Sequence, residues 1–351
     1  MTTFSATQST AGAIANDVAK TRAGSRKARY FFVGMAILFP VIAVIGFTPS
    51  YQAMNAGTLT PHWVVHIHGA LMTSWLLVFL AQAILAANGN FKFHRKLGLL
   101  SVVLGVLVWL AMATVSAHAL IANHPPKEDF LFDLLLMEFY AMSSFGLFFT
   151  WGIFVRKKDS AAHKRLLMLA TLVLLQAAVD RIHWLPLLGI GYPYVFFLYL
   201  DTLLIPLFIY DFFSLRRIHK ITLIGSGVII MLQLSVSLIW GSPAWHQFWF
   251  NRLAPFVEKV IEVKLNDAQT DPLLGNYGDK KWHMTVSDDK GKLYLKLPDQ
   301  PAFELGAISK TELFVTTILW KLYFVKGADG RVIKVINKQG PLTWEVQRLK
   351  N

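Results

Sequence analysis

The 351-residue sequence contains no cysteine and carries little charge. The lack of cysteine excludes disulfide bridges, cysteine-ligated zinc, iron–sulfur clusters and thiol nucleophiles. Charged residues make up 16% of the chain, against about 25% in soluble globular proteins, while hydrophobic residues make up 54%. The sequence also lacks the fingerprints of a P-loop, a dinucleotide site, a zinc protease and a serine hydrolase. These absences argue against a soluble enzyme, and the hydropathy argues against a disordered chain.

In their place are seven apolar stretches, each long enough for the roughly 20 helical residues that cross a bilayer. They cover 30–47, 63–86, 97–121, 130–155, 166–188, 193–213 and 221–241. Residues 1–29 are polar and lack the apolar core of a cleavable signal peptide. We therefore expect a mostly α-helical membrane protein, with a seven-transmembrane-helix bundle at 30–241 behind a disordered leader at 1–29.

Basic residues are distributed unevenly between the predicted loops. The leader and the loops at 87–96, 156–165 and 214–220 are rich in Lys and Arg, whereas the alternating loops have none or only Lys127. The positive-inside rule then places the N-terminus in the cytoplasm and everything after residue 241 outside a bacterial inner membrane. The net charge of +13 is accounted for by cytoplasmic loops. The expected partner is thus the lipid bilayer, and nucleic acid is not expected.

The chain after the last span changes character twice. Residues 242–269 contain clustered aromatics that suit the membrane interface and predict an interfacial helix and linker. From residue 270 the hydrophobic pattern has period two, with Gly-containing turns between short runs. This pattern predicts a small antiparallel β-barrel-like domain at 270–351, outside the membrane. Its aromatic residues and one histidine are expected in the core or in cross-strand pairs: Trp282, His283, Tyr294, Trp320 and Trp344.

Ionisable residues inside membrane spans are costly, and they usually mark a functional site. Here they gather in the predicted outer half of the bilayer, and Asp211 stands apart near the cytoplasmic end of the sixth span. The outer set comprises His66, His68, His118, Asp133, Glu138, Asp180, Arg181, His183 and Asp201. His66 and His68 are about 200° apart around a helix, so one ligand cannot face both without distortion. The sequence does not say which of the two faces the bundle.

Three interpretations of the outer set stay open. In the first, His66, His68, His118 and His183 ligate haem b or a divalent metal, and the carboxylates are further ligands or hydrogen-bond acceptors. Those carboxylates are Glu138, Asp180 and Asp201. In the second, the cluster relays protons or binds a polar substrate, with Arg181 holding an anion. In the third, the residues only stabilise the bundle.

The possible functions of the protein belong to different classes. The leading hypothesis is redox or cofactor-handling work at the outer site. One alternative is a metal-dependent membrane hydrolase, in which a carboxylate acts as base to a metal-bound water. Another is a non-enzymatic sensor or scaffold, whose β-domain binds a periplasmic ligand or protein partner.

A weak internal repeat relates the second and third spans to the fourth and fifth. His94 and His163 take equivalent places, each at the start of a helix after a basic loop. A two-haem arrangement on shared helices needs ligands about 13–14 residues apart. The spacings from His94 to His118 and from His163 to His183 are longer than that. The simplest interpretation of His94 and His163 is that both are interfacial helix starts.

Two resemblances follow from these motifs. The stretch 66–100, HIHGALMTSWLLVFLAQAILAANGNFKFHRKLGLL, resembles bacterial families of multi-span membrane proteins of unknown function, in which a His-Gly helix precedes an H-R-x-L-G helix start. DRIHWLP at 180–186 fits the same pattern. Some distantly similar small membrane proteins act in haem–copper oxidase maturation, and this resemblance favours a haem or metal site.

The second resemblance concerns the C-terminal domain. Residues 271–349, which include LLGNYGDKKWHMTVSDDKGKLYLKL and FVKGADGRVIKVINKQG, are similar to the lipocalin-like β-domain appended to β-lactamase-related serine hydrolases. In that family the domain is an accessory, and the nucleophile belongs to a separate domain. This chain has no such hydrolase domain, so the resemblance implies no hydrolase activity.

Overall fold

The computed structural model describes residues 4–122, 129–182, 184–186, 188, 193–253, 262–278, 283–298, 302–316, 320–339 and 342–349. The chain divides into two compact units. The first, here called the bundle unit, comprises Met1–Thr48, Ile67–Met112 and Phe139–Ser237. The second, here called the barrel unit, comprises Pro49–His66, Ala113–Glu138 and Leu238–Asn351.

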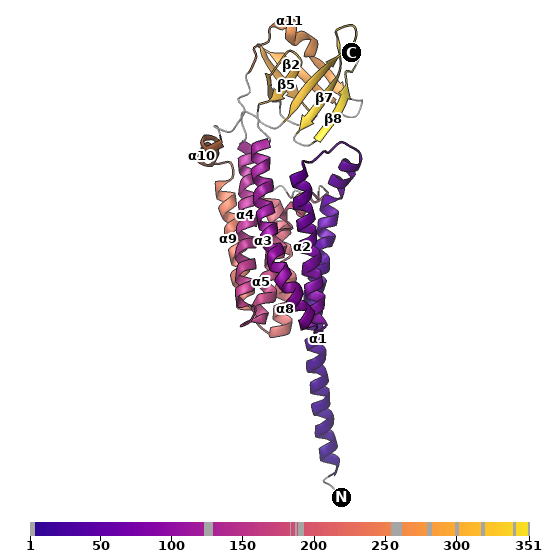
Figure 1. The fold of residues 1–351 in the computed structure, drawn as a ribbon, viewed down its shortest axis with the longest axis vertical. Helices are drawn as coiled ribbons and strands as arrows, with labels where there is room; N and C mark the ends of the chain where they lie inside the picture. Colours follow the sequence, from indigo (N-terminus) through magenta and orange to yellow (C-terminus); the bar gives the residue numbers. More distant parts are fainter. Residues whose placement is uncertain are drawn as a thin grey trace. The chain divides into compact units, whose positions relative to one another are not determined.

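Seven helical segments are long and apolar enough to cross a membrane, which makes the chain a multi-pass membrane protein and confirms the predicted fold class (Figure 1). They are Tyr30–Asn55, Trp63–Ala87, Phe91–Leu120, Phe132–Val155, Ser160–Val179, Tyr194–Leu215 and Lys220–Ile239. The predicted orientation in the membrane stays a prediction.

These segments belong to the first nine of the ten helices that precede the C-terminal domain in the described part of the chain. The ten are α1 (Phe4–Asn55), α2 (Trp63–Ala87), α3 (Phe91–Ala122), α4 (Asp129–Val155), α5 (Ser160–Val173), α6 (Gln176–Val179), α7 (Tyr194–Thr202), α8 (Ile205–Leu215), α9 (Lys220–Ile239) and α10 (Pro243–Leu253). Helix α1 includes residues 4–29, for which the sequence predicts a disordered leader. That predicted disorder stays a prediction. The predicted sixth span is divided into α7 and α8, and Pro206 occupies the first turn of α8, where its missing N–H costs nothing.

Small residues let the helices of the bundle unit approach one another closely. A Cβ atom on Gly105 of α3 would clash with the ring of Phe149 in α4. A Cβ atom on Gly225 of α9 would clash with the side chain of Leu169 in α5. Close approach through glycine is typical of helix packing in membranes, where van der Waals contact drives association. The indole of Trp75 on α2 donates a hydrogen bond of 3.2 Å to Thr171 of α5 in the same core.

The C-terminal part of the barrel unit is a single antiparallel sheet whose eight strands follow chain order (Figure 1). Two short helices precede it, α11 (Asp267–Thr270) and a 3-10 turn at Asp271–Leu273. The strands are β1 (Gly275–Gly278), β2 (His283–Asp289), β3 (Lys292–Lys296), β4 (Phe303–Ala307), β5 (Glu312–Val315), β6 (Lys321–Lys326), β7 (Val332–Gln339) and β8 (Leu342–Gln347). Between β2 and β3, Lys290 and Gly291 both have positive φ, as the predicted hairpin turn requires.

The sheet closes on itself. Tyr277 of β1 bridges to Arg348 beyond β8, and the Leu349 amide donates to the Asn276 carbonyl at 2.8 Å. Eight strands enclose a space just wide enough for side chains to fill. Tyr277 is fully buried, and Trp320 is buried with its indole donating to Asn337 at 2.9 Å. The predicted core role of Trp320 is confirmed, His283 is exposed, and Trp282 lies outside the described residues.

Candidate functional site

His68 is the predicted site residue with the most distinctive surroundings. It lies on α2 in the bundle unit, half-buried, and its ring has a hydrogen-bonding interaction with the backbone of Ala111 on α3. Its Nδ1 atom is buried and has no hydrogen-bond partner. Arg181 lies within electrostatic range of the ring. A buried nitrogen without a partner costs free energy, so it points either to a ligand or to a specific structural reason.

The structure distinguishes the two histidines of the H-I-H motif. His66 is exposed, whereas His68 is half-buried. This difference follows from helix geometry, since residues two apart point to nearly opposite sides. His68 is therefore the one that faces protein, a question that the sequence leaves open.

Two of the predicted carboxylates in the bundle unit accept hydrogen bonds from glutamine side chains. The amide of Gln176 donates to Asp180 at 2.6 Å. The amide of Gln233 on α9 donates to Asp201 on α7 at 3.0 Å and to the hydroxyl of Tyr140 on α4 at 3.2 Å. An amide is a neutral donor, so these two hydrogen bonds themselves bring no charge to the carboxylates. His183 lies outside the described residues.

The barrel unit holds the other predicted residues, His66, His118 and Glu138. The ring of His118 stacks on that of His62, with centroids 4.2 Å apart and planes 24° apart. Sequence reasoning missed His62 because it falls just before the predicted span. The signal was available, since His62 and His66 have the i, i+4 spacing that places two imidazoles on one helix face.

Asp133 of the outer set is paired within the barrel unit. It accepts hydrogen bonds from His246 Nε2 at 2.9 Å and from the Gly241 amide at 3.0 Å. Nearby, the indole of Trp245 donates to the Phe132 carbonyl at 2.7 Å. These bonds fasten the start of α10 to α4. The sequence could not find the pair, because His246 lies more than a hundred positions from Asp133.

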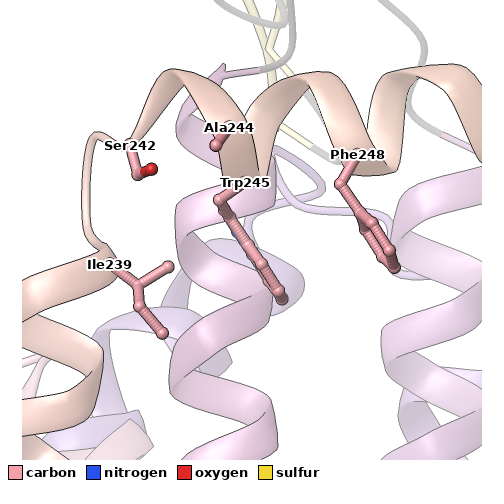
Figure 2. A pocket seen from close by; sticks show the side chains of 5 residues that line it. All are labelled: Ile239, Ser242, Ala244, Trp245 and Phe248. Atoms are coloured by element: carbon pink, nitrogen blue, oxygen red, sulfur yellow. The ribbon is translucent and has the colours of Figure 1, made fainter.

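Helix α10 also borders an open apolar groove. Figure 2 shows the side chains of Trp245 and Phe248 projecting in the same direction from α10, and their rings are stacked with planes 7° apart. The groove has a volume of about 360 Å³, and Ile239, Ser242 and Ala244 complete its lining. Aromatic side chains of this kind suit a membrane interface, as the sequence predicts for this segment.

A different polar centre joins α5, α8 and α9. Arg165 and Asp211 form a fully buried ion pair, with Arg165 Nε 3.1 Å from Asp211 Oδ1. The same carboxylate accepts from the Thr222 hydroxyl and from the His219 amide at 3.1 Å. In the sequence, Asp211 stands apart from the other ionisable residues of the spans. In the structure it has a charged partner, Arg165.

The described residues contain no group of three or more His, Asp or Glu side chains placed to hold a metal ion. A catalytic zinc site uses about three protein ligands, whereas haem iron needs only one or two axial ligands.

No protein-family model matches the chain, and no curated protein is significantly similar to it. The two sequence resemblances therefore identify no family. In its described residues, the chain has seven candidate membrane spans followed by an eight-stranded antiparallel near-barrel.

Proposed function

We propose that this multi-pass membrane protein binds haem in its bundle unit and carries out redox or cofactor-handling work there. The observation that carries the proposal is the buried Nδ1 of His68, which has no hydrogen-bond partner. The ring's other interaction is with the backbone of Ala111. In a neutral imidazole, the nitrogen that bonds a carbonyl carries the proton, so the second nitrogen keeps its lone pair. Histidines that ligate iron are usually oriented in this way.

His183, which the sequence predicts as a ligand, lies outside the described residues and is proposed as a second residue that would hold the haem. Asp180 would serve as a hydrogen-bond acceptor near the site, and Arg181, within electrostatic range of His68, suits the carboxylates of a haem. When bound, haem supplies one-electron chemistry, and the residues of the chain would hold it, orient it and exclude water.

His66, His118 and Glu138 belong to the barrel unit, and the structure does not bring these three described residues together as the ligands of one metal ion. A metal-dependent hydrolase and a scaffold that acts through the β-domain are the competing functions. Neither has an observation comparable to the buried nitrogen of His68.

The test is an absorption spectrum of the full chain purified in mild detergent from haem-supplied cells, before and after reduction with dithionite. We expect a Soret band and, on reduction, an α band of b type. His68→Gln should lower the haem-to-chain ratio, while His283→Gln, an exposed histidine of the β-domain, should leave it unchanged. A folded His68→Gln protein with the wild-type haem content would overturn the assignment. If the full chain takes up no haem under these conditions, the haem proposal fails, and the hydrolase and the scaffold are the functions to test next.

A further inference from the structure

Each of the two helical hairpins of the internal repeat contains the same kind of hydrogen bond, from a histidine ring to a backbone carbonyl. His94 lies in the first turn of α3, and its Nδ1 is 3.4 Å from the carbonyl of Gln82 on α2. His163 lies in the first turn of α5, and its Nδ1 is 2.8 Å from the carbonyl of Gly152 on α4. In each hairpin, the ring binds a carbonyl of the preceding helix. The repeat detected in the sequence thus extends to the orientation of both rings.

These bonds set the chemistry of the two rings. A carbonyl oxygen only accepts, so the Nδ1 atom of each neutral imidazole must carry the proton. The lone pair then belongs to Nε2 in both His94 and His163. An N–H···O=C bond of this kind is the usual support for a metal-ligating histidine, because it fixes the tautomer and the plane of the ring.

The side chain of His94 also lies within electrostatic range of His163, although the residues are on different hairpins. Both side chains are half-buried. Cofactor sites in helix bundles are built from side chains of facing helices, and the interfaces of repeats often hold them.

The basic residues beside His94 and His163 limit the kinds of ligand that these histidines can bind. Arg95 and Lys96 follow His94 and are exposed, and Lys164 follows His163. This basic setting repels a bare divalent cation. A haem brings two propionate carboxylates, which lysine and arginine attract, together with an iron that takes two axial imidazoles.

We propose that His94 and His163 bind a single haem through their Nε2 atoms, at a site separate from that of His68. The simple interpretation of both residues as interfacial helix starts accounts for their position. It does not account for the matching hydrogen bonds of the two Nδ1 atoms. The proposal does not rest on the site at His68, because none of its observations involves that residue.

The test uses the full chain in detergent and measures the haem-to-chain ratio by pyridine haemochrome, together with the low-spin ferric signal by electron paramagnetic resonance. The variants are His94→Gln, His163→Gln and the double variant, because glutamine keeps an amide donor for the carbonyl but does not ligate iron. His283→Gln is the matched control. We expect each single variant to lose one haem per chain, or to convert one low-spin haem to high spin. The double variant should do no more than either single one, because both residues hold the same iron.

The outcomes separate the two sites. Wild-type haem content and spin state in folded His94→Gln and His163→Gln would overturn this proposal, as would losses in the two variants that add. If those variants lose haem while His68→Gln does not, this proposal stands and the site at His68 fails. The reverse pattern retains only the site at His68. A chain that takes up no haem overturns both. Monodispersity and thermal unfolding in detergent confirm that each variant is folded.

Discussion

Two polar centres of the bundle unit differ in how completely their hydrogen bonds are satisfied. At Asp211, the carboxylate has as donors a buried cation from α5, a hydroxyl from α9 and the backbone amide of His219 just before α9. At His68, the buried Nδ1 atom of the ring has no hydrogen-bond partner. We expect the satisfied centre to stabilise the fold, whereas we propose that the unsatisfied nitrogen is open to a ligand. The comparison of the two centres can be tested by substitution.

The largest effect is expected where the satisfied centre is broken. Asp211→Ala leaves the guanidinium of Arg165 buried without a counter-charge, which typically costs about 3–5 kcal/mol. Thermal or denaturant unfolding in detergent measures the loss. Replacing both members of the pair by leucine should recover much of it, because no uncompensated charge then remains buried. An Asp211→Ala protein as stable as the wild type would show that the centre is not a fastening.

A second buried polar group with a hydrogen-bond partner is the hydroxyl of Tyr277 in the β-barrel. It lowers the stability of the fold only when it loses its proton. The hydroxyl of buried Tyr277 donates to the Leu273 carbonyl at 2.7 Å, and burial raises the pKa of Tyr277 from 10.0 to about 12. Between these values the folded state keeps the proton and the unfolded state has lost it. Stability should therefore be complete below pH 10 and fall as the pH approaches 12, by roughly 3 kcal/mol at most.

The measurement compares denaturant unfolding of the wild type and of Tyr277→Phe at several pH values. The phenylalanine variant should lack this alkaline loss, so the difference in stability between the two proteins should narrow as the pH rises from 10 to 12. Other tyrosines and lysines titrate equally in both proteins and cancel. A difference that is independent of pH would contradict the assignment.

A smaller effect is expected at the start of α5, close to His163. Asp159 caps this helix, and its carboxylate accepts from the Ala162 amide at 2.8 Å. That bond lowers the pKa of Asp159, so its contribution is present above the unfolded value of 3.8 and is lost as the pH falls through the folded value. Asp159→Ala should cost about 1 kcal/mol at neutral pH. Asp159→Asn, which keeps a capping oxygen, is the matched control and should cost less.

The sequence predicts much of the architecture and little of the side-chain pairing. Seven spans and a barrel-like domain follow from apolar length and from period-two patterning, which act locally. Strands β1 and β4 are short and contain glycine, so the sequence carries only weak strand signals for them. The pairs Arg165–Asp211 and Asp133–His246 could not be predicted, since hydropathy does not say which residues of distant helices meet. The repeat did point to His94 and His163, but only the hydrogen bonds give their orientation.

The smallest effect on stability, and the sharpest test of the comparison, is expected at the unsatisfied centre. His68→Leu removes a buried nitrogen that has no partner and replaces the ring with an apolar side chain. Losing an unsatisfied polar group offsets much of the lost packing, so the haem-free variant should unfold within about 1 kcal/mol of the haem-free wild type. Unfolding is measured in the same detergent as for Asp211→Ala. A loss as large as that of Asp211→Ala would mean that His68 fastens α2 to α3, and the contrast between a structural centre and an open one would fail.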